Sequence, residues 1–199
     1  MRLCRWLALP FALACALPAF AQEQLKLFVG YSFSRPSVTY GQVTDCPLTC
    51  PTPPATATNH PNFNGYEFSA TYKLLPWIGA TADFSGHYGT VTGHSSGHVQ
   101  TYLVGPELAL PARVSPFAHV LFGVAHQAVG AGAATYRGNP VTVLHSSDNA
   151  FATVVGAGID LHVAPFLSFR AIQIDSLVTR FHSSTQNQPR VSSGLVLRF

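Results

Sequence analysis

The most informative feature of this 199-residue sequence is a two-residue alternation of apolar and polar side chains. The alternation is clearest in Arg190–Phe199. One face of an extended chain there is mostly apolar and ends in Phe199, whereas the other face is small or polar and carries Arg198. A segment of about ten residues is long enough to cross a bilayer as a tilted strand. The pattern therefore predicts a terminal β-strand that spans a membrane.

Seven further segments alternate in the same way. They are Lys26–Arg35, Phe63–Leu75, Trp77–Tyr88, His98–Leu110, Pro116–Gln127, Asn149–Val163 and Phe166–Phe181. Two of them contain an irregularity. Pro106 cannot donate a hydrogen bond to a neighbouring strand, so we expect a bulge at that position. Arg170 and Gln173 cannot both face inward in a regular strand, which predicts a second bulge near Ala171.

The connections between these segments alternate in length. Three of them are short turns, at Pro76, Pro111–Ser115 and Ala164–Pro165. The other four are longer and polar, at Pro36–Asn62, Gly89–Gly97, Gly130–Asp148 and His182–Pro189. Short turns on one side and long loops on the other are typical of outer-membrane barrels.

The charged residues indicate which face points outward. If the apolar faces point outward, the inward faces carry nine charged residues, namely Lys26, Glu67, Lys73, Asp83, Glu107, Asp160, Arg170, Asp175 and Arg198. A lysine or arginine on the lipid face costs roughly 2–4 kcal/mol at the bilayer midplane, and the apolar faces almost lack charge. A soluble sandwich with its charges outside is the alternative, but it does not account for the loop asymmetry. We therefore predict an all-β fold, an eight-stranded antiparallel up-and-down transmembrane β-barrel.

The interior of such a barrel is just wide enough to be filled by side chains. We expect the nine charged residues to form an interior charge network, because an unpaired buried charge is costly. Aromatic residues near the strand ends are candidates for interfacial girdles. They are Tyr31, Phe33, Tyr66, Tyr88 and Tyr102 on one side, and Phe117 and Phe199 on the other.

The first 21 residues have the features of a secretory signal peptide. Arg2 and Arg5 precede an apolar run at Trp6–Leu17, and Ala19-Phe20-Ala21 matches a cleavage site. Lipidation at Cys15 is a weaker alternative, because the preceding residues fit a lipobox poorly. We expect residues 1–21 to be a signal peptide and residues 22–199 to be the barrel domain.

Composition narrows the possible classes of protein. Cleavage would leave 9 basic and 8 acidic residues out of the 11 and 8 of the whole chain, a net charge of +1. A nucleic-acid-binding protein needs a dense basic face, so that class is excluded. After the signal no segment offers about 18 consecutive apolar residues, so no transmembrane helix is expected. Export then leaves a soluble periplasmic or secreted protein, or a transmembrane barrel.

Two cysteines, Cys46 and Cys50, lie in the longest connection, in the sequence CPLTC. An exported protein can form disulfides, and this spacing suits a small loop staple. A zinc site would need further ligands, and His60 is the only nearby histidine. A redox pair would normally be C-x-x-C, one residue shorter. We predict a disulfide here, no metal site and no cofactor.

Catalytic residues are not expected. Among the nine histidines, only His94 and His98 have a close ligand-like spacing on one segment. Some eight-stranded barrels deacylate lipid A with histidine, serine and an acid on their outer surface, and His182 with Ser184 matches part of that set. The acidic partner is missing, because the glutamates of the barrel segments are predicted to point inward. A triad is recognised by its geometry and not by three residue types alone.

Several short motifs resemble the OmpA-like family of outer-membrane barrel domains. They are GYSFSR at 30–35, GPE at 105–107, PFAHVLFG at 116–123, GAGIDL at 156–161 and the terminal GLVLRF. The resemblance implies a location in the outer membrane of a Gram-negative-type bacterium, in contact with its lipid. The full OmpA arrangement adds a peptidoglycan-binding domain, but this sequence stops at the barrel, so a peptidoglycan-binding role is not expected. It also implies that assembly machinery recognises the terminal strand and Phe199.

The expected role is structural or adhesive, exerted through long outward loops. The connection Pro36–Asn62 is the best candidate for contact with an extracellular ligand, since loops on rigid scaffolds commonly carry binding. A lipid A-modifying hydrolase and a narrow pore are the alternatives.

Overall fold

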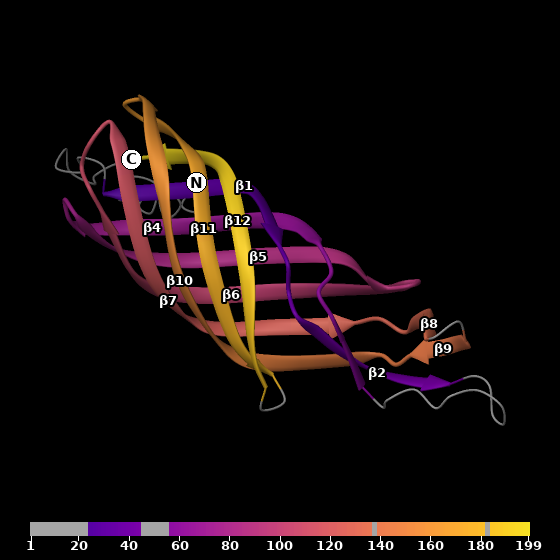
Figure 1. Cartoon of the computed structure of the whole chain (residues 1–199). Coiled ribbons are helices and arrows are strands. Elements are labelled where there is room, and N and C mark those ends of the chain that lie inside the picture. The colour runs from indigo at the N-terminus through magenta and orange to yellow at the C-terminus, as the bar shows by residue number, and fades with distance from the viewer. Residues whose placement is uncertain (1–23, 45–55, 137–138, 182–183) are drawn as a thin grey trace, which may run out of the picture.

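A computed structural model describes residues 24–44, 56–136, 139–181 and 184–199. Eight antiparallel strands close into a barrel in the order β1-β12-β11-β10-β7-β6-β5-β4 (Figure 1). Their bounds are Leu25–Ser34 (β1), Phe63–Leu75 (β4), Ile78–Thr92 (β5), Ser95–Ala109 (β6), Val114–Val129 (β7), Ser146–Ala164 (β10), Leu167–Phe181 (β11) and Ser184–Arg198 (β12). The barrel closes because β1 pairs with β12 on one side and with β4 on the other. This confirms the predicted fold class.

Some expectations fall outside the described residues. These are the signal peptide, the two cysteines Cys46 and Cys50, and His182 of the alternative hydrolase. In the four described ranges no helix is long and apolar enough to cross a membrane.

The alternation along each barrel strand separates an apolar outside from a polar inside. On β12, Leu195 is 48% exposed and Phe199, directly after the strand, is 58% exposed, whereas Arg190 and Ser192 are 1% and 2% exposed. Large hydrophobic side chains are exposed in the same way on every barrel strand. A water-soluble barrel would show the reverse arrangement, with an apolar core and a polar surface.

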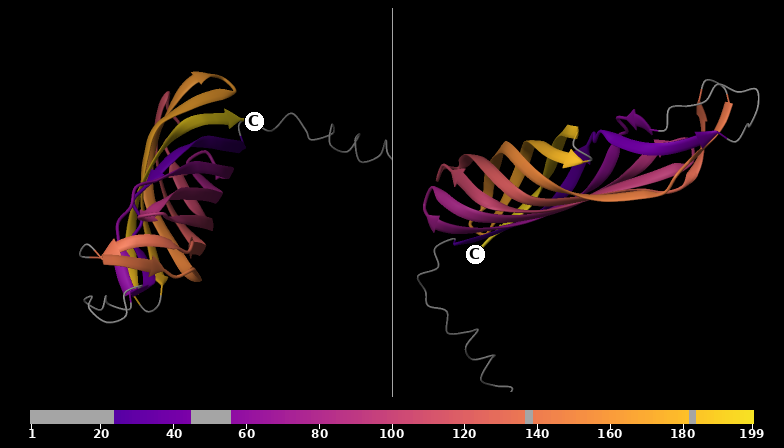
Figure 2. Two further views of the ribbon diagram at one scale, coloured as in Figure 1. Left: turned by 90° about the vertical axis from the view of Figure 1, so that its right-hand side faces the viewer. Right: turned by 90° about the horizontal axis from the view of Figure 1, so that it is seen from below.

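A second sheet extends from one end of the barrel. Its strands are β2 (Val38–Thr44), β3 (Thr56–Asn59), β8 (Gly132–Tyr136) and β9 (Asn139–Val143), in the order β3-β2-β9-β8. We call this the extension sheet. Figures 1 and 2 show it at the end opposite the C-terminus. The connections Pro36–Asn62 and Gly130–Asp148 are therefore partly β-structure, and their prediction as plain loops was wrong.

The extension sheet is held by its own apolar cluster. The cluster joins β2 and β9 to the ends of barrel strands through Val38, Tyr40, Phe63, Val91, Val99, Val129 and Val143. These side chains are all less than a tenth exposed. The sheet is thus packed onto the barrel, because its residues share this core with those of β4, β5, β6 and β7.

Two other predicted loops are mostly strand. The expected loop Gly89–Gly97 is a tight hairpin, because β5 continues to Thr92 and β6 starts at Ser95. Gly93 in that turn has a φ of 51°, a conformation that glycine adopts at no steric cost. The expected loop His182–Pro189 is shorter as well, since β12 begins at Ser184.

The two predicted irregularities differ in outcome. Gln173 and Arg170 are both buried inside the barrel, and the register between β11 and β12 shifts between them, which confirms a bulge near Ala171. At Pro106 the bulge prediction was wrong. The register of β6 with β7 is the same before and after Pro106, and Pro106 stays opposite Ala80 of β5. The proline is accommodated because the ladder to β7 is interrupted there without a shift.

The other end of the barrel carries the three short turns, and we call it the short-turn end. The turns join β4 to β5, β6 to β7, and β10 to β11. Leu25 and Phe199 lie side by side at this end, where each backbone N–H donates to the carbonyl of the other residue.

Candidate functional site

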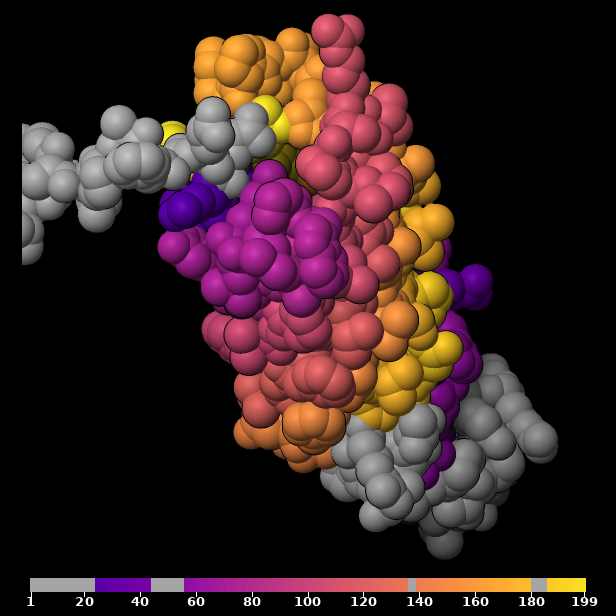
Figure 3. All heavy atoms as spheres, turned by 90° about the vertical axis from the view of Figure 1, so that its left-hand side faces the viewer, coloured from indigo at the N-terminus to yellow at the C-terminus, as the bar shows by residue number. Residues whose placement is uncertain are grey.

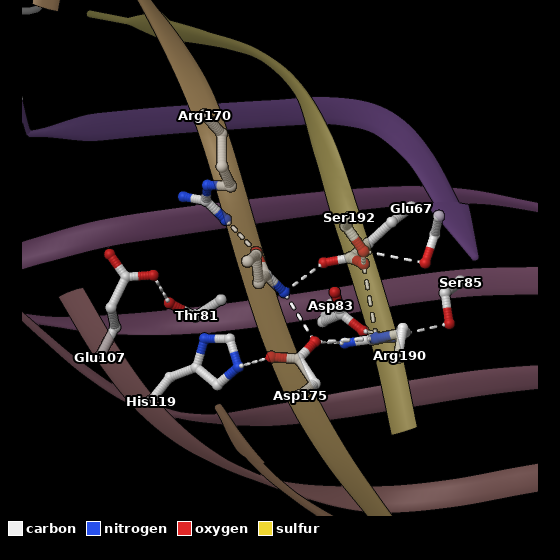
Figure 4. A network of polar contacts seen from close by, with 12 residues as sticks. Glu67, Thr81, Asp83, Ser85, Glu107, His119, Arg170, Asp175, Arg190 and Ser192 are labelled. Atoms are coloured by element: carbon white, nitrogen blue, oxygen red, sulfur yellow. Dashed lines mark hydrogen bonds and ion pairs between the residues drawn. The ribbon is translucent and has the colours of Figure 1, made fainter. Parts of the chain in front are cut away.

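The candidate site is a network of charged and polar side chains inside the barrel (Figure 4). It contains two arginines, one paired with three carboxylates and the other with one, and a glutamine that connects them. Both arginines are almost completely buried. Buried charges of this kind must be paired and hydrogen-bonded, because taking an ion out of water costs several kcal/mol.

Arg190 on β12 is the centre of the first group. Its Nε and Nη2 donate to Asp175 Oδ2 at 2.8 and 2.6 Å, and its Nη1 lies 3.2 Å from Asp83 Oδ1. Glu67 Oε2 is 3.5 Å from Nε, and Ser85 Oγ accepts a bond from Nη1 at 2.9 Å. We call Arg190, Glu67, Asp83 and Asp175 the Arg190 cluster. It ties together β4, β5, β11 and β12 across the barrel interior.

Arg170 on β11 is the centre of the second group. Its Nε and Nη2 donate to the two oxygens of Asp160 at 2.8 and 3.1 Å, in the bidentate geometry that arginine favours. Lys26 Nζ pairs with Glu107 and lies 3.9 Å from Asp160. We call Arg170, Asp160, Lys26 and Glu107 the Arg170 cluster.

Aromatic rings and hydroxyls complete the Arg170 cluster. The guanidinium of Arg170 lies over Phe28 and Phe117, 4.4 and 4.0 Å from the ring centroids. Such contacts are favourable and stronger where water is excluded. Thr71 and Thr81 each donate to Glu107 Oε2 at 3.3 Å. The carboxylate of Glu107 is therefore held by a lysine and two hydroxyls.

Gln173 connects the two clusters. Its amide nitrogen donates to Glu67 Oε1 at 2.7 Å and to Asp175 Oδ2 at 2.8 Å, while its carbonyl oxygen accepts from Arg170 Nη1 at 2.6 Å. The bulge in β11 makes this possible, because it lets Arg170 and Gln173 face inward together. The result is one hydrogen-bonded network rather than two separate groups.

Two further side chains, His119 and Ser192, extend this network. His119 Nε2 lies 3.0 Å from Asp175 Oδ1. Ser192 donates to Glu67 Oε2 at 2.5 Å. Glu67 and Asp175 thus each have several partners, so the interior resists separation of the strands that carry them.

A buried apolar cluster fills the interior beside the charged network. It consists of Leu103, Leu121, Ala125, Ala150, Ala152, Val154 and Leu177. The centre of the barrel is thus packed with polar groups in one part and apolar groups in another. This arrangement favours a closed interior over a water-filled channel.

A polar and aromatic rim borders the exposed apolar band on the side of the extension sheet. The Tyr66 and Tyr88 hydroxyls are 3.5 Å apart, and the rings of Tyr88 and His98 are 5.9 Å apart. His126 Nδ1 lies 2.8 Å from Asn149 Oδ1. Rings with one polar edge suit the boundary between lipid and water.

Phe117 was wrongly predicted to belong to a girdle at the other end. It is only 4% exposed and packs on Arg170 inside the barrel. Phe117 lies on the face of β7 that points into the barrel, together with His119 and Leu121.

The structure places the nine residues expected in the interior as follows. Eight are buried in the barrel, namely Lys26, Glu67, Asp83, Glu107, Asp160, Arg170, Asp175 and Arg198. Lys73 lies half-buried at the short-turn end. Arg198 donates to the Pro165 carbonyl at 2.9 Å, and its backbone lies opposite that of Lys26 in the ladder between β1 and β12.

Sequence reasoning missed the central cation, Arg190. The alternation of β12 could have identified it, because Arg190 is separated from Ser192 and Arg198 by an even number of positions and so lies on the same inward face. His119 and Gln173 were also missed as network members, because the prediction considered only charged residues, and histidine was counted as uncharged. In the ranges that the structure describes, no three histidine, cysteine, aspartate or glutamate side chains form an arrangement that could hold a metal ion.

Comparison with known proteins shows a similarity of fold alone. No family model and no curated protein matches the sequence. Neisserial surface protein A is 10% identical with a TM-score of 0.58, and the match covers 87% of this chain and 97% of that one. The attachment invasion locus protein Ail of Yersinia pestis is 12% identical with a TM-score of 0.51, over 88% and 99% of the chains. The outer membrane protein OprG of Pseudomonas aeruginosa is 9% identical with a TM-score of 0.51, over 90% and 97%. The chain therefore has the fold of bacterial eight-stranded outer-membrane barrels.

Proposed function

We propose that this chain is an integral outer-membrane protein whose barrel is an anchor and whose extension sheet makes contacts at the cell surface. The observation that carries the proposal is the band of exposed apolar side chains around an interior of paired charges. In water such a band would far exceed the apolar patch of a few hundred Å² that soluble monomers expose. In a bilayer the same side chains contact hydrocarbon.

The lengths of the connections orient the barrel. Outer-membrane barrels have short turns on the periplasmic side and longer extracellular segments. The short-turn end, with Leu25 and Phe199, would then face the periplasm. The extension sheet would project from the cell surface.

The extension sheet is suited to binding because it is packed on the barrel and, among the described strands, has an edge strand with one side unpaired. Strand β3 is at one edge of the sheet, paired only with β2 among the described strands. Thr56, Thr58 and Asn59 are exposed on or along that edge. An exposed strand edge can accept a strand from another chain. Ail, a protein of similar fold, is named for attachment and invasion, which agrees with an adhesive role.

The terminal strand would be the contact for the assembly machinery. β12 closes the barrel against β1, and the aromatic ring of Phe199 is exposed at the short-turn end. This partner is proposed from the family resemblance and from the exposed position of Phe199.

Membrane insertion is tested by the gel mobility of the membrane fraction with and without boiling. We expect a shift on boiling, because folded outer-membrane barrels resist unfolding in detergent. A single position for boiled and unboiled samples would contradict the membrane-barrel proposal.

The adhesive role needs a separate test. Cells expressing the wild type would be compared with cells in which Thr56–Asn59 is replaced by four glycines. Retention under flow would be measured on surfaces coated with proteins or polysaccharides. We expect retention to fall with the glycine variant and to be unchanged in the control Arg113→Gln at the short-turn end. Equal retention of wild-type cells and cells lacking the protein would contradict adhesion and leave the barrel proposal intact.

A further inference from the structure

The short-turn end of the barrel contains a cavity of about 350 Å³. Figure 3 shows this end of the molecule, where the turns between β4 and β5, β6 and β7, and β10 and β11 surround a hollow. The cavity lies over the Arg170 cluster, since Lys26 and Asp160 contribute to both. Its size is in the range of pockets that hold small molecules.

The cavity wall is strongly basic. Four cationic side chains line it, namely Lys26, Lys73, Arg113 and Arg198, together with His162. Asp160 is the one carboxylate in the lining, and both of its oxygens accept bonds from Arg170 beneath the cavity. Lys26 is paired with Glu107. The lining thus contains four cationic side chains and one carboxylate, and a concave wall of low dielectric concentrates the potential of such a lining.

A buried hydroxyl without a partner also lines this cavity. Ser168 is 0% exposed, and its Oγ has no hydrogen-bond partner among the described residues. Buried polar groups in native proteins almost always have a partner, so an unpaired one needs an explanation. The neighbouring Ser115 is different, because its Oγ donates to the Leu110 carbonyl at 2.6 Å. Ser168 is therefore a donor available to a ligand in the cavity.

Two side chains of the wall are fixed by backbone groups. Arg198 Nη2 donates to the Pro165 carbonyl, and His162 Nδ1 lies 3.1 Å from the Arg113 carbonyl. These contacts attach the guanidinium and the imidazole to the turns that form the rim. The basic groups are thus positioned before any ligand arrives, which lowers the entropy cost of binding.

We propose that this cavity binds an oxyanion, the phosphate or carboxylate group of a small molecule. The basic side chains supply the charge, and the Ser168 hydroxyl donates a hydrogen bond to the oxyanion. The site itself follows from the cavity lining. Only its exposure to the periplasm depends on the proposed membrane orientation.

The test is calorimetric titration of the folded protein in detergent micelles at constant ionic strength. The probes are inorganic phosphate, N-acetylglycinate and chloride. We expect saturable binding of phosphate, of the carboxylate, or of both, and none of chloride. Binding of phosphate alone would assign the source to phosphate compounds, and binding of the carboxylate to acids such as peptide ends. A saturable response to neither oxyanion, or an equal response to chloride, would overturn the proposal.

Variants separate a built site from general charge attraction. Arg113→Gln and Ser168→Ala should each weaken binding at least threefold, with unchanged heat-modifiable mobility. Arg113 is exposed, so its replacement tests the site even if Ser168→Ala does not fold. The matched control is Arg35→Gln, which removes the same charge at the extension end. Equal weakening by Arg35→Gln would contradict the proposal.

Discussion

Replacing Arg190 by methionine is the sharpest test of the interior network. Arg190 is 1% exposed and is the shared partner of Glu67, Asp83 and Asp175. Removing one partner of a buried ion pair typically destabilises a protein by about 3–5 kcal/mol, because the other charge stays buried. Here three carboxylates lose their cation, so we expect a loss at or above that range. At 1.4 kcal/mol for each factor of ten, the unfolding equilibrium changes by at least about 100-fold.

The assay is urea unfolding of the barrel in lipid vesicles, followed by gel mobility without boiling. Arg35→Met is the control, since Arg35 is exposed and has one long bond of 3.4 Å to the His60 carbonyl. We expect that variant to stay within about 0.5 kcal/mol of the wild type. Adding Asp175→Asn to Arg190→Met should recover part of the loss, because one unpaired carboxylate is then removed. A loss below about 1 kcal/mol for Arg190→Met would refute the structural role of the network.

Three further predictions follow from the same structure. In planar bilayers the wild type should show no steady channel conductance, because packed side chains fill the interior; stable open-channel steps would indicate a pore. Phe199→Ala should reduce the fraction of heat-modifiable barrel in cells, whereas Phe166→Ala, which removes another exposed ring at the same end, should not; equal reductions would show that Phe199 has no special role in assembly. His182→Ala should leave lipid A acylation unchanged by mass spectrometry; a change in the acylation pattern on expression of the wild type, lost in this variant, would identify a hydrolase.

The barrel strands could be predicted from the sequence because each one is long and alternates regularly. Period two fixes which residues face inward once one strand is oriented, so Glu67 on β4 and Asp160 on β10 follow from the same rule. The charged residues indicate which face of every strand points inward, because charge on the lipid face is costly. The bulge in β11 was also predictable, since two long polar side chains needed the same face.

The extension sheet could not be predicted in this way. Its strands have four to seven residues each, and β2 pairs with β9, about a hundred residues further along the chain. Strands so short carry too few alternating positions to separate them from loops. Proline and threonine around β2 and glycine and alanine around β8 favoured the loop interpretation. Their pairing depends on contacts between distant segments, which no local pattern contains.

Details inside the barrel also depend on three-dimensional geometry. The alternation along β12 predicts that Arg190 faces inward. The approach of Glu67, Asp83 and Asp175 to Arg190 depends on the registers of four strands. The cavity at the short-turn end depends likewise on three turns meeting. Nothing in the sequence around Ser168 indicates that its hydroxyl lacks a hydrogen-bond partner in the described part of the structure.

The central claim is the orientation of the side chains, with apolar groups in lipid and ionic groups inside. Nuclear magnetic resonance in lipid nanodiscs tests it without substitutions, through cross-peaks between methyl groups and lipid acyl chains. Val155 and Leu195 are exposed on the outer face, whereas their neighbours Val154 and Val196 are completely buried. We predict lipid cross-peaks for Val155 and Leu195 and none for Val154 and Val196; the reverse pattern would contradict the account.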